Sequence, residues 1–164
     1  MDRLNWLKEM RQQVEERYDT LWAPQYGETL GLYPNATHIR YIQKFLDLLP
    51  TRAAILDAAC GAGRYISEFL NAGHSVIGID QSQGMLDRAT DRFPGIQTMR
   101  VGLQEMSFHE AFDGAVCMDA MEHVCPEDWP VVLANFQRAL KTRGYFYCTV
   151  ETYGEQEIKG FSSD

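Results

Sequence analysis

Two short apolar runs, each with an aspartate at or beside its end, constrain the fold of this 164-residue chain more than any other feature. The first run covers residues 53–58 and the second covers residues 75–80. Runs of this kind are typical of strands buried on both faces of a parallel sheet. Between them lie a glycine turn and a helix-like stretch over residues 65–72, which Gly73 closes. The spacing predicts a βαβ unit.

The rest of the chain continues this alternation. We expect further helices over residues 2–20, 37–49, 83–92 and 128–141, and further strands over residues 98–101, 112–118 and 145–150. Thr37 and Asp128 are the expected N-caps of two of these helices. Residues 21–35, with two prolines and several glycine or asparagine breakers, indicate an irregular loop. The pattern predicts an α/β fold with a doubly wound, mostly parallel sheet of about five strands and helices on both faces.

The charge balance bears on possible partners. The 15 basic and 23 acidic side chains give a formal net charge of −8, which repels the phosphate backbone of nucleic acids. We therefore expect no nucleic-acid partner. No stretch approaches the roughly 20 apolar residues that cross a bilayer, and the amino terminus lacks a signal-peptide core. The sequence thus predicts a soluble, cytoplasmic protein without a membrane partner.

The cysteines and histidines indicate no metal site. The four cysteines lack C-x-x-C spacing, and no two of the four histidines are spaced along the chain as metal ligands usually are. We expect neither a disulfide framework nor a bound metal. Only convergence in the fold could bring such ligands together.

A glycine turn follows the first strand, in Asp57-Ala58-Ala59-Cys60-Gly61-Ala62-Gly63-Arg64. Gly61 and Gly63 tolerate positive φ and leave backbone amides open to a ligand. Asp80 ends the second strand, at the separation from the turn that places a carboxylate on a ribose in nucleotide-binding folds. Two simpler interpretations stay open. In one the glycines only form a tight turn packed on the sheet, and in the other Asp80 only caps the helix that begins near Ser82. The context of buried strand, turn and helix favours nucleotide binding.

Two details argue against a dinucleotide-binding enzyme. The dinucleotide fingerprint requires a third glycine three residues after the second, and Ile66 stands at that position. Asp57 lies just before the turn, where a carboxylate would repel a pyrophosphate but attract a cationic amino group. A nicotinamide oxidoreductase is therefore disfavoured.

In these residues the sequence resembles the class I S-adenosylmethionine-dependent methyltransferases, whose first motif follows the pattern of residues 57–63. Segments like the family's later motifs follow in the same order, at residues 78–82, 103–108, 112–124 and 140–145. The resemblance covers roughly residues 52–151 and implies a Rossmann-like core. It also implies S-adenosyl-L-methionine as cofactor and S-adenosyl-L-homocysteine as product.

The resemblance implies roles for individual residues. Asp57 would hold the ammonium group of the cofactor, and Asp80 would bind its ribose. The family often has an acid that binds adenine near residue 102, but this chain has Gly102, so Gln104 would replace that acid. The implied cofactor-binding residues are Tyr18, Asp57, Ala58, Gly61, Gly63, Asp80, Gln81, Met85, Leu103, Gln104 and Met118.

Aromatic residues near the amino terminus are candidates for a lid over the transferred methyl group. Tyr18, Trp22 and Tyr26 have faces that attract a sulfonium cation, although ordinary packing explains such a cluster equally well. Met118 lies at the end of the fourth strand and is either a wall of the ligand site or plain core.

His123 is the candidate catalytic residue. A neutral imidazole on the loop after the fourth strand could remove a proton from an acceptor hydroxyl or amine. The alternative is that His123 only hydrogen-bonds its own loop. Methyl transfer is an in-line displacement that depends mainly on alignment, so the expected acceptor is any oxygen, nitrogen or carbon nucleophile of a small molecule.

The expected organisation has three parts. Residues 1–50 form helices and a lid region, residues 51–151 form the cofactor-binding core, and residues 152–164 form a short polar tail. The tail is too short for the last strands that the family usually has. A cofactor-binding module or truncated fragment without turnover is therefore the second hypothesis. The uncovered edge of the fifth strand predicts a homodimer through that strand.

Overall fold

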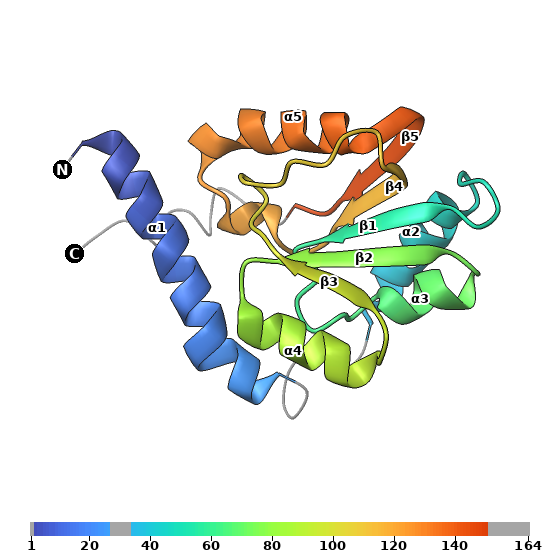
Figure 1. Cartoon of the computed structure of the whole chain (residues 1–164), viewed down its shortest axis with the longest axis horizontal. Helices are drawn as coiled ribbons and strands as arrows, with labels where there is room; N and C mark the ends of the chain where they lie inside the picture. Colours follow the sequence, from blue (N-terminus) through green and yellow to red (C-terminus); the bar gives the residue numbers. More distant parts are fainter. Residues whose placement is uncertain (1, 27–33, 151–164) are drawn as a thin grey trace.

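A five-stranded parallel sheet organises the molecule (Figure 1). The structure is a computed structural model that describes residues 2–26 and 34–150. Within these residues the strands lie in the order β3-β2-β1-β4-β5, and every neighbouring pair is parallel. The bounds are β1 Ala54–Ala58, β2 Ser75–Asp80, β3 Gln97–Arg100, β4 Phe112–Cys117 and β5 Leu140–Cys148. The predicted Rossmann-like α/β sheet is confirmed.

Helices cover both faces of the sheet, as predicted. The α2–α4 side and the α5 side are separated by the strands (Figure 1), with helix bounds α2 Ala36–Leu46, α3 Ile66–Asn71, α4 Gln83–Arg92 and α5 Trp129–Ala139. Successive residues of β1 face opposite layers. Ile55 packs in a cluster with Ile42 and Phe69, whereas Leu56 packs in a cluster with Phe136. Burial on both faces explains why the strands read as unbroken apolar runs.

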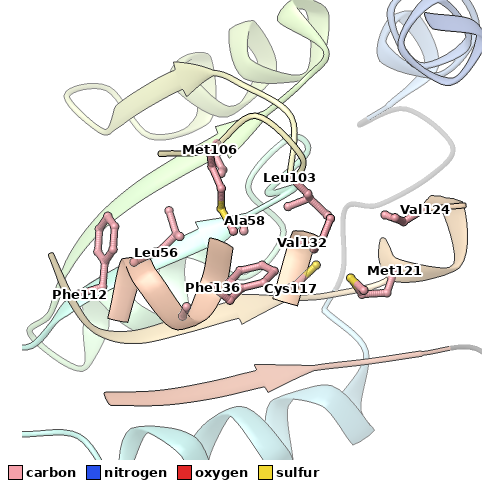
Figure 2. Close-up of a cluster of buried hydrophobic side chains, with 13 residues drawn as sticks. Leu56, Ala58, Leu103, Met106, Phe112, Cys117, Met121, Val124, Val132 and Phe136 are labelled. Carbon is pink, nitrogen blue, oxygen red and sulfur yellow. The ribbon is translucent and has the colours of Figure 1, made fainter. Parts of the chain in front are cut away.

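The connection from β3 to β4, residues 101–111, contains a turn but no helix, and all of its residues are described. Its Leu103 and Met106 are buried in the same cluster as Phe136 of α5, as Figure 2 shows. Asn135 of α5 donates a hydrogen bond to the Leu103 carbonyl at 2.9 Å. Side chains of this connection therefore share the covering of one sheet face with α5.

The amino-terminal segment is a continuous run of helical turns. It consists of α1 Arg3–Arg17, a π-helical turn Tyr18–Trp22 and a 3₁₀ turn Ala23–Gln25. The predicted loop over residues 21–35 is therefore wrong for residues 21–25, because proline is tolerated in a first helical turn and Pro24 occupies one. Leu7 is the only buried residue of α1, so polar contacts must hold α1 in place.

Of the two predicted N-caps, Thr37 is wrong, and Asp128 occupies the N-cap position of α5 without a capping hydrogen bond. α2 begins one residue before Thr37, and the side chain of Asn35 accepts hydrogen bonds from the Thr37 and His38 amides at 2.8 and 3.4 Å. Asp128 directly precedes α5 but makes no capping hydrogen bond. Its carboxylate instead accepts from Arg11 at 2.7 and 2.9 Å. A contact across 117 residues thus replaces the local one.

β5 begins at Leu140, directly after α5, rather than at the predicted Tyr145. Residues 141–144 form a bulge opposite Asp113, after which the ladder with β4 resumes. Lys141 Nζ donates to both carboxylate oxygens of Asp113, at 2.9 and 3.0 Å. The residues of the bulge are polar or glycine, so the pattern of apolar residues does not mark the beginning of this strand.

Three predictions concern the edges and ends of the molecule. β5 lies at one edge of the described sheet and pairs with β4 alone, so a dimer through this edge stays a prediction. The predicted tail, residues 152–164, lies outside the described residues. Among the helices of residues 2–26 and 34–150, none is long and apolar enough to cross a membrane.

Candidate active site

A cavity of about 480 Å³ opens at the carboxyl ends of β1, β2 and β4. The sheet order reverses at this point, because β2 and β3 lie on one side of β1 and β4 and β5 on the other. Ligands of doubly wound folds bind outside such a switch point. Most of the predicted site residues line the cavity: Tyr18, Asp57, Gly61, Asp80, Gln81, Met85, Leu103, Gln104, Met118 and His123.

The two glycines of the turn have different surroundings. Gly61 has a φ of +53°, lines the cavity and has open space where a side chain would project. Gly63 has a φ of +74°, and a Cβ there would lie 2.9 Å from Ile66 Cδ1 and 3.1 Å from the Phe93 ring. Gly63 therefore allows the turn to pack closely, and neither Gly63 nor the fully buried Ala58 lies on the cavity wall.

Two non-glycine residues of the cavity wall have left-handed backbone conformations. Ala59, after β1, has a φ of 56°, and Asp119, after β4, has a φ of 51°. Such conformations persist only where surrounding contacts fix them, and they cluster at functional sites. The Asp119 amide donates to Thr149 Oγ1 at 2.7 Å, and Arg64 donates to the Asp119 carboxylate at 3.1 Å. These contacts hold the end of β4 in its strained geometry.

Asp57 is a buried carboxylate without a cationic partner. The residue is 3% exposed and lines the cavity, and its Oδ2 has no hydrogen-bond partner among residues 2–26 and 34–150. Burial, followed by the charge of Asp80, raises the pKa of Asp57 to about 7. A carboxylate in this state gains from any ligand that brings a positive charge or a hydrogen-bond donor.

Asp80 supports the turn that it faces. Its Oδ2 accepts from the Gly61 amide and its Oδ1 accepts from the Ser82 amide, both at 2.9 Å. Burial raises the pKa of Asp80, although these hydrogen bonds oppose that effect. The helix cap is Ser82, whose Oγ accepts from the Met85 amide at 3.1 Å. A carboxylate has about four acceptor positions, so Asp80 can still accept a bond from a ligand beside those from the Gly61, Ser82 and Gln81 amides.

The segment after β3 forms another wall, through residues 101–104. Gln104 Nε2 donates to Asp128 Oδ2 at 3.3 Å, which fixes the side chain of Gln104. The carboxylate of Glu105 lies beside Gly102, in the space that a side chain at position 102 would occupy. An acidic side chain is thus present beside position 102, but Glu105 does not line the cavity and is paired with Arg11 at 3.5 Å.

Aromatic side chains of the helical amino-terminal segment close the cavity on one side. Tyr18, Trp22 and Tyr26 pack together on the buried residues Ala62 and Met85. They therefore lie over the glycine turn and α4, which agrees with the lid hypothesis. The same contacts agree equally with ordinary packing, so both interpretations remain.

A second contact holds the same segment to the start of α4. Asp19 Oδ1 accepts from the Gly84 amide at 3.0 Å and from the Ser82 hydroxyl. The π-helical turn is thereby tied to the end of β2, which is consistent with the frequent occurrence of such turns at functional sites.

His123 lies at the exposed rim of the cavity. Its Nε2 is hydrogen-bonded to the Tyr18 hydroxyl at 3.0 Å, and the two rings meet edge to face. Burial, followed by the charge of Asp80, raises the pKa of Tyr18 to about 12, so this hydroxyl is protonated at neutral pH. The contact joins the loop after β4 to the amino-terminal segment and was not predicted.

Sequence reasoning missed five polar residues of the wall, namely Arg11, Arg17, Arg64, Tyr65 and Glu122. Arg64 directly follows the glycine turn and donates to the Tyr26 hydroxyl at 2.6 Å. Glu122 directly precedes His123, so proximity to the motifs was an available signal for these two. No local signal marked Arg11, because its partner Asp128 is remote in the sequence.

The buried side-chain atoms that lack a hydrogen-bond partner in the described residues all come from this cavity wall. They are Asp57 Oδ2, Arg64 Nε and Glu122 Oε2. Buried polar atoms normally have partners, so each unpaired atom requires an explanation. Two acceptors and one donor that share one cavity indicate a polar ligand with complementary groups.

Comparison with known proteins agrees with this geometry. Residues 55–144 match the family model described as a methyltransferase domain. The chain belongs to the class I S-adenosylmethionine-dependent methyltransferases. The methyltransferase motifs read from the sequence are therefore confirmed at the level of the family.

Individual methyltransferases are similar over most of this chain. A tRNA (carboxymethyluridine(34)-5-O)-methyltransferase of Arabidopsis thaliana is 27% identical over 140 residues, which cover 84% of this chain and 32% of that protein. A ubiquinone biosynthesis O-methyltransferase of Acinetobacter baylyi is 26% identical over 138 residues, which cover 79% and 57%. The chain thus spans about a third to just over half the length of these two methyltransferases.

A solved methyltransferase structure shares the fold. The 1,6-didemethyltoxoflavin-N1-methyltransferase of Burkholderia thailandensis, crystallised with 1,6-didemethyltoxoflavin and S-adenosylhomocysteine, superimposes with a TM-score of 0.69 at 19% identity. The match covers 94% of this chain and 67% of that one. At this identity the likeness supports the fold alone.

Proposed function

We propose that this domain binds S-adenosylmethionine in the cavity described above and transfers its methyl group to an oxygen, nitrogen or carbon nucleophile of a small molecule. Family membership supports the reaction class. The unpaired, buried Oδ2 of Asp57 is the observation that carries the binding proposal, because it suits the ammonium group of the methionine part.

Three features of the wall suit the amino-acid end of the cofactor. Asp57 Oδ2 provides an acceptor for the ammonium group, and Arg64 Nε provides a donor for the carboxylate. Gly61 leaves open space at the turn, so the ligand can approach the main chain. Gly63 and Ala58 lie off the wall, and we assign them to the shape of the turn rather than to contact.

The nucleoside end would lie along the ends of β2 and β3. Asp80 has acceptor positions left for ribose hydroxyls beyond its two backbone bonds. Gln81 and Met85 on one side, with Leu103 and Gln104 on the other, line the space for the adenine ring.

When bound, S-adenosylmethionine supplies a methyl group activated by an adjacent positive sulfur. The chain's own contribution is alignment and the exclusion of water, which in favourable cases supply about 7–11 kcal/mol of barrier reduction. Tyr18, Trp22 and Tyr26 would exclude water and present aromatic faces to the cation. Met118 and Asp119 line the wall at the end of β4, beside the route of the acceptor.

The small-molecule assignment rests on charge and cavity size. A net charge of −8 opposes nucleic acid, and a cavity of about 480 Å³ is within the range of small-molecule sites. By its name the Arabidopsis relative acts on tRNA, which is the main competing acceptor class.

Calorimetry combined with a transfer assay tests this function. Wild-type protein should bind S-adenosylmethionine and S-adenosylhomocysteine, and it should methylate members of a panel of small hydroxyl, amine, carboxylate and activated-carbon compounds, detected by mass spectrometry. Binding without any product would instead support the cofactor-binding module. Methylation of tRNA alone would contradict the small-molecule assignment, and absence of binding would contradict the whole proposal.

A further inference from the structure

Glu122 is the one residue with an unpaired buried atom on the cavity wall that the proposed cofactor contacts do not use. Its Oε2 has no hydrogen-bond partner in the described part of the chain. Asp57 and Arg64, which have the other two unpaired atoms, suit the two charged groups of the cofactor's amino-acid end. A third group, supplied by the methyl acceptor, is therefore expected at Glu122.

The backbone around Glu122 is firmly held. Glu122 is the middle residue of the 3₁₀ turn Met121–His123 that follows β4. Met121 and Val124, on either side, are buried in the same hydrophobic cluster as Phe136 of α5 (Figure 2). The Val124 amide donates to the Met121 carbonyl at 3.1 Å. Trp129 Nε1 donates to the Val124 carbonyl at 3.1 Å. These contacts fix the point from which the Glu122 side chain reaches the cavity.

Two basic side chains of the cavity wall are ion-paired, and a third, Arg17, lies over the Trp22 ring. Arg11 is paired with Asp128, at 2.7 Å, and Arg64 is paired with Asp119, at 3.1 Å. No ion pair of Glu122 occurs among residues 2–26 and 34–150. A carboxylate oxygen that is buried and unpaired favours a ligand that donates a hydrogen bond and disfavours one that brings another negative charge.

His123, the residue predicted from the sequence as the base, is engaged elsewhere. Its Nε2 is bonded to the Tyr18 hydroxyl at 3.0 Å, and its side chain lies at the exposed rim. To accept a proton on that nitrogen, it would have to lose the bond to Tyr18. Glu122 Oε2 has no hydrogen bond to lose among the described residues.

We propose that Glu122 accepts the hydrogen of the acceptor's hydroxyl or amine group and takes its proton during transfer, so that the acceptors are O–H or N–H compounds rather than carboxylates. The acceptor heteroatom bonds to the methyl carbon as the carbon–sulfur bond breaks, and that electron pair passes to sulfur. The acceptor's proton passes to Glu122 Oε2, which balances the step. This inference rests on the proposed function and deepens it.

Sinefungin tests the position of Glu122 without a known acceptor. In this cofactor analogue a carbon bearing a primary ammonium replaces the methylsulfonium, so its ammonium marks the place of methyl delivery. Its affinity relative to S-adenosylhomocysteine is measured by calorimetry for wild type, Glu122→Gln, His123→Gln and Glu9→Gln. Glu9→Gln is the matched control, because Glu9 is an exposed residue of α1 that lies outside the cavity wall.

Glu122→Gln should weaken sinefungin binding about tenfold or more, because it removes a charge-assisted hydrogen bond. Binding of S-adenosylhomocysteine should change less than about twofold in the same variant, which also shows that the variant is folded. His123→Gln and Glu9→Gln should leave the ratio of the two affinities unchanged.

Several outcomes would overturn the assignment. An unchanged ratio in Glu122→Gln, an equal loss of both ligands, or a shift in the ratio in His123→Gln alone would each exclude Glu122 as the group facing the acceptor. Methyl esters as the main products of the acceptor panel would exclude the proposed acceptor class. If wild type binds neither compound, the proposed function fails and the role of Glu122 fails with it.

Discussion

Acidic side chains at the ends of the strands and acidic side chains under α1 are in opposite states. Asp57 and Asp80 are buried, have no cationic partner in the described part of the chain and have raised pKa values, to about 7 for Asp57. Asp128 and Glu127 bind Arg11 and Arg3, respectively. The pKa of Asp128 is lowered chiefly by its hydrogen bond from Arg11, and that of Glu127 by a backbone hydrogen bond and then by Arg3.

We propose that this difference separates carboxylates that serve a ligand from carboxylates that serve the fold. A buried carboxylate without a partner destabilises the protein, and its retention suggests that a ligand completes it. An ion-paired carboxylate already has its partner. Glu127 and Asp128, which lie in the loop between β4 and α5, connect that loop to Arg3 and Arg11 of α1 (Figure 1). Substitution of Asp57 should therefore weaken binding but stabilise the free protein, whereas substitutions among the ion-paired residues should at most lower stability.

Asp57→Asn should give the largest effect. We expect S-adenosylmethionine binding to weaken by about 30- to 1000-fold, as for a buried charged partner, measured by calorimetry. The free protein should become more stable at pH 8 by about 2–4 kcal/mol, measured by denaturant unfolding. The same variant at pH 4 should be close to wild type in stability.

The sign follows from the raised pKa of Asp57. The folded state binds a proton below about pH 7, whereas the unfolded chain releases it near pH 4. Stability from this group is thus complete below about pH 4 and is lost as the pH rises through 7. A variant that loses binding and also loses stability at pH 8 would contradict this account of Asp57.

Asp80→Ala should weaken binding of S-adenosylmethionine by about ten- to a hundredfold, because charge-assisted hydrogen bonds to a ribose are lost. The Gly61 and Ser82 amides also lose their acceptor, so the melting temperature should fall. Unchanged affinity by calorimetry would contradict the ribose assignment, whereas a lowered melting temperature alone would leave Asp80 a purely structural role.

Affinity itself should depend on pH. Because an ammonium ligand requires ionised Asp57, binding should release a proton, and affinity should fall about tenfold per pH unit below 7. Above about pH 8 it should fall again as the ligand's α-amino group loses its proton. Calorimetry in buffers of different ionisation enthalpy measures the released proton, and a pH-independent affinity in wild type would contradict the prediction.

Arg11→Gln should have a smaller effect, and it should change the stability of the protein rather than cofactor binding. The loss of two hydrogen bonds to buried Asp128 should lower the free energy of unfolding by about 1–2 kcal/mol. Because the pKa of Asp128 is lowered in the fold, this stabilisation is present above about pH 4 and is lost in acid. Unfolding curves of Arg11→Gln, Asp128→Asn and the double variant measure the coupling, and simple additivity would contradict it.

Glu127→Gln should have the smallest effect, with no measurable change in either binding or stability. Its contact with Arg3 is exposed, and exposed ion pairs contribute little. A marked loss of cofactor binding in Glu127→Gln would show that α1 is held by this pair and would erase the proposed distinction between the two acidic sets.

The sequence by itself determined the centre of the molecule. β2 and α4 have their predicted bounds, because a buried strand and an amphipathic helix are defined by the local spacing of apolar residues. Parallel strands end at one edge of a sheet, which brought Asp57, Gly61 and Asp80 to the same cavity without knowledge of any side-chain contact.

The tertiary structure decided the features that depend on contacts between distant residues. Arg11 withdraws Asp128 from its expected capping role, Tyr18 engages His123, and the bulge opposite Asp113 moves the beginning of β5. In each case the side chain or strand contacts a partner at least 28 residues away in the chain. Local pattern cannot report such a partner, because the energy that selects it arises only when the sheet is assembled.

The unpaired oxygen of Glu122 is the clearest case. Nothing in the spacing of residues 121–124 distinguishes Glu122 from His123 as the group facing the cavity. Burial of Met121 and Val124 in the core and the bond between Tyr18 and His123 leave Glu122 as the unpaired group. An unmet hydrogen bond is a property of packed surroundings, and only the folded chain has those.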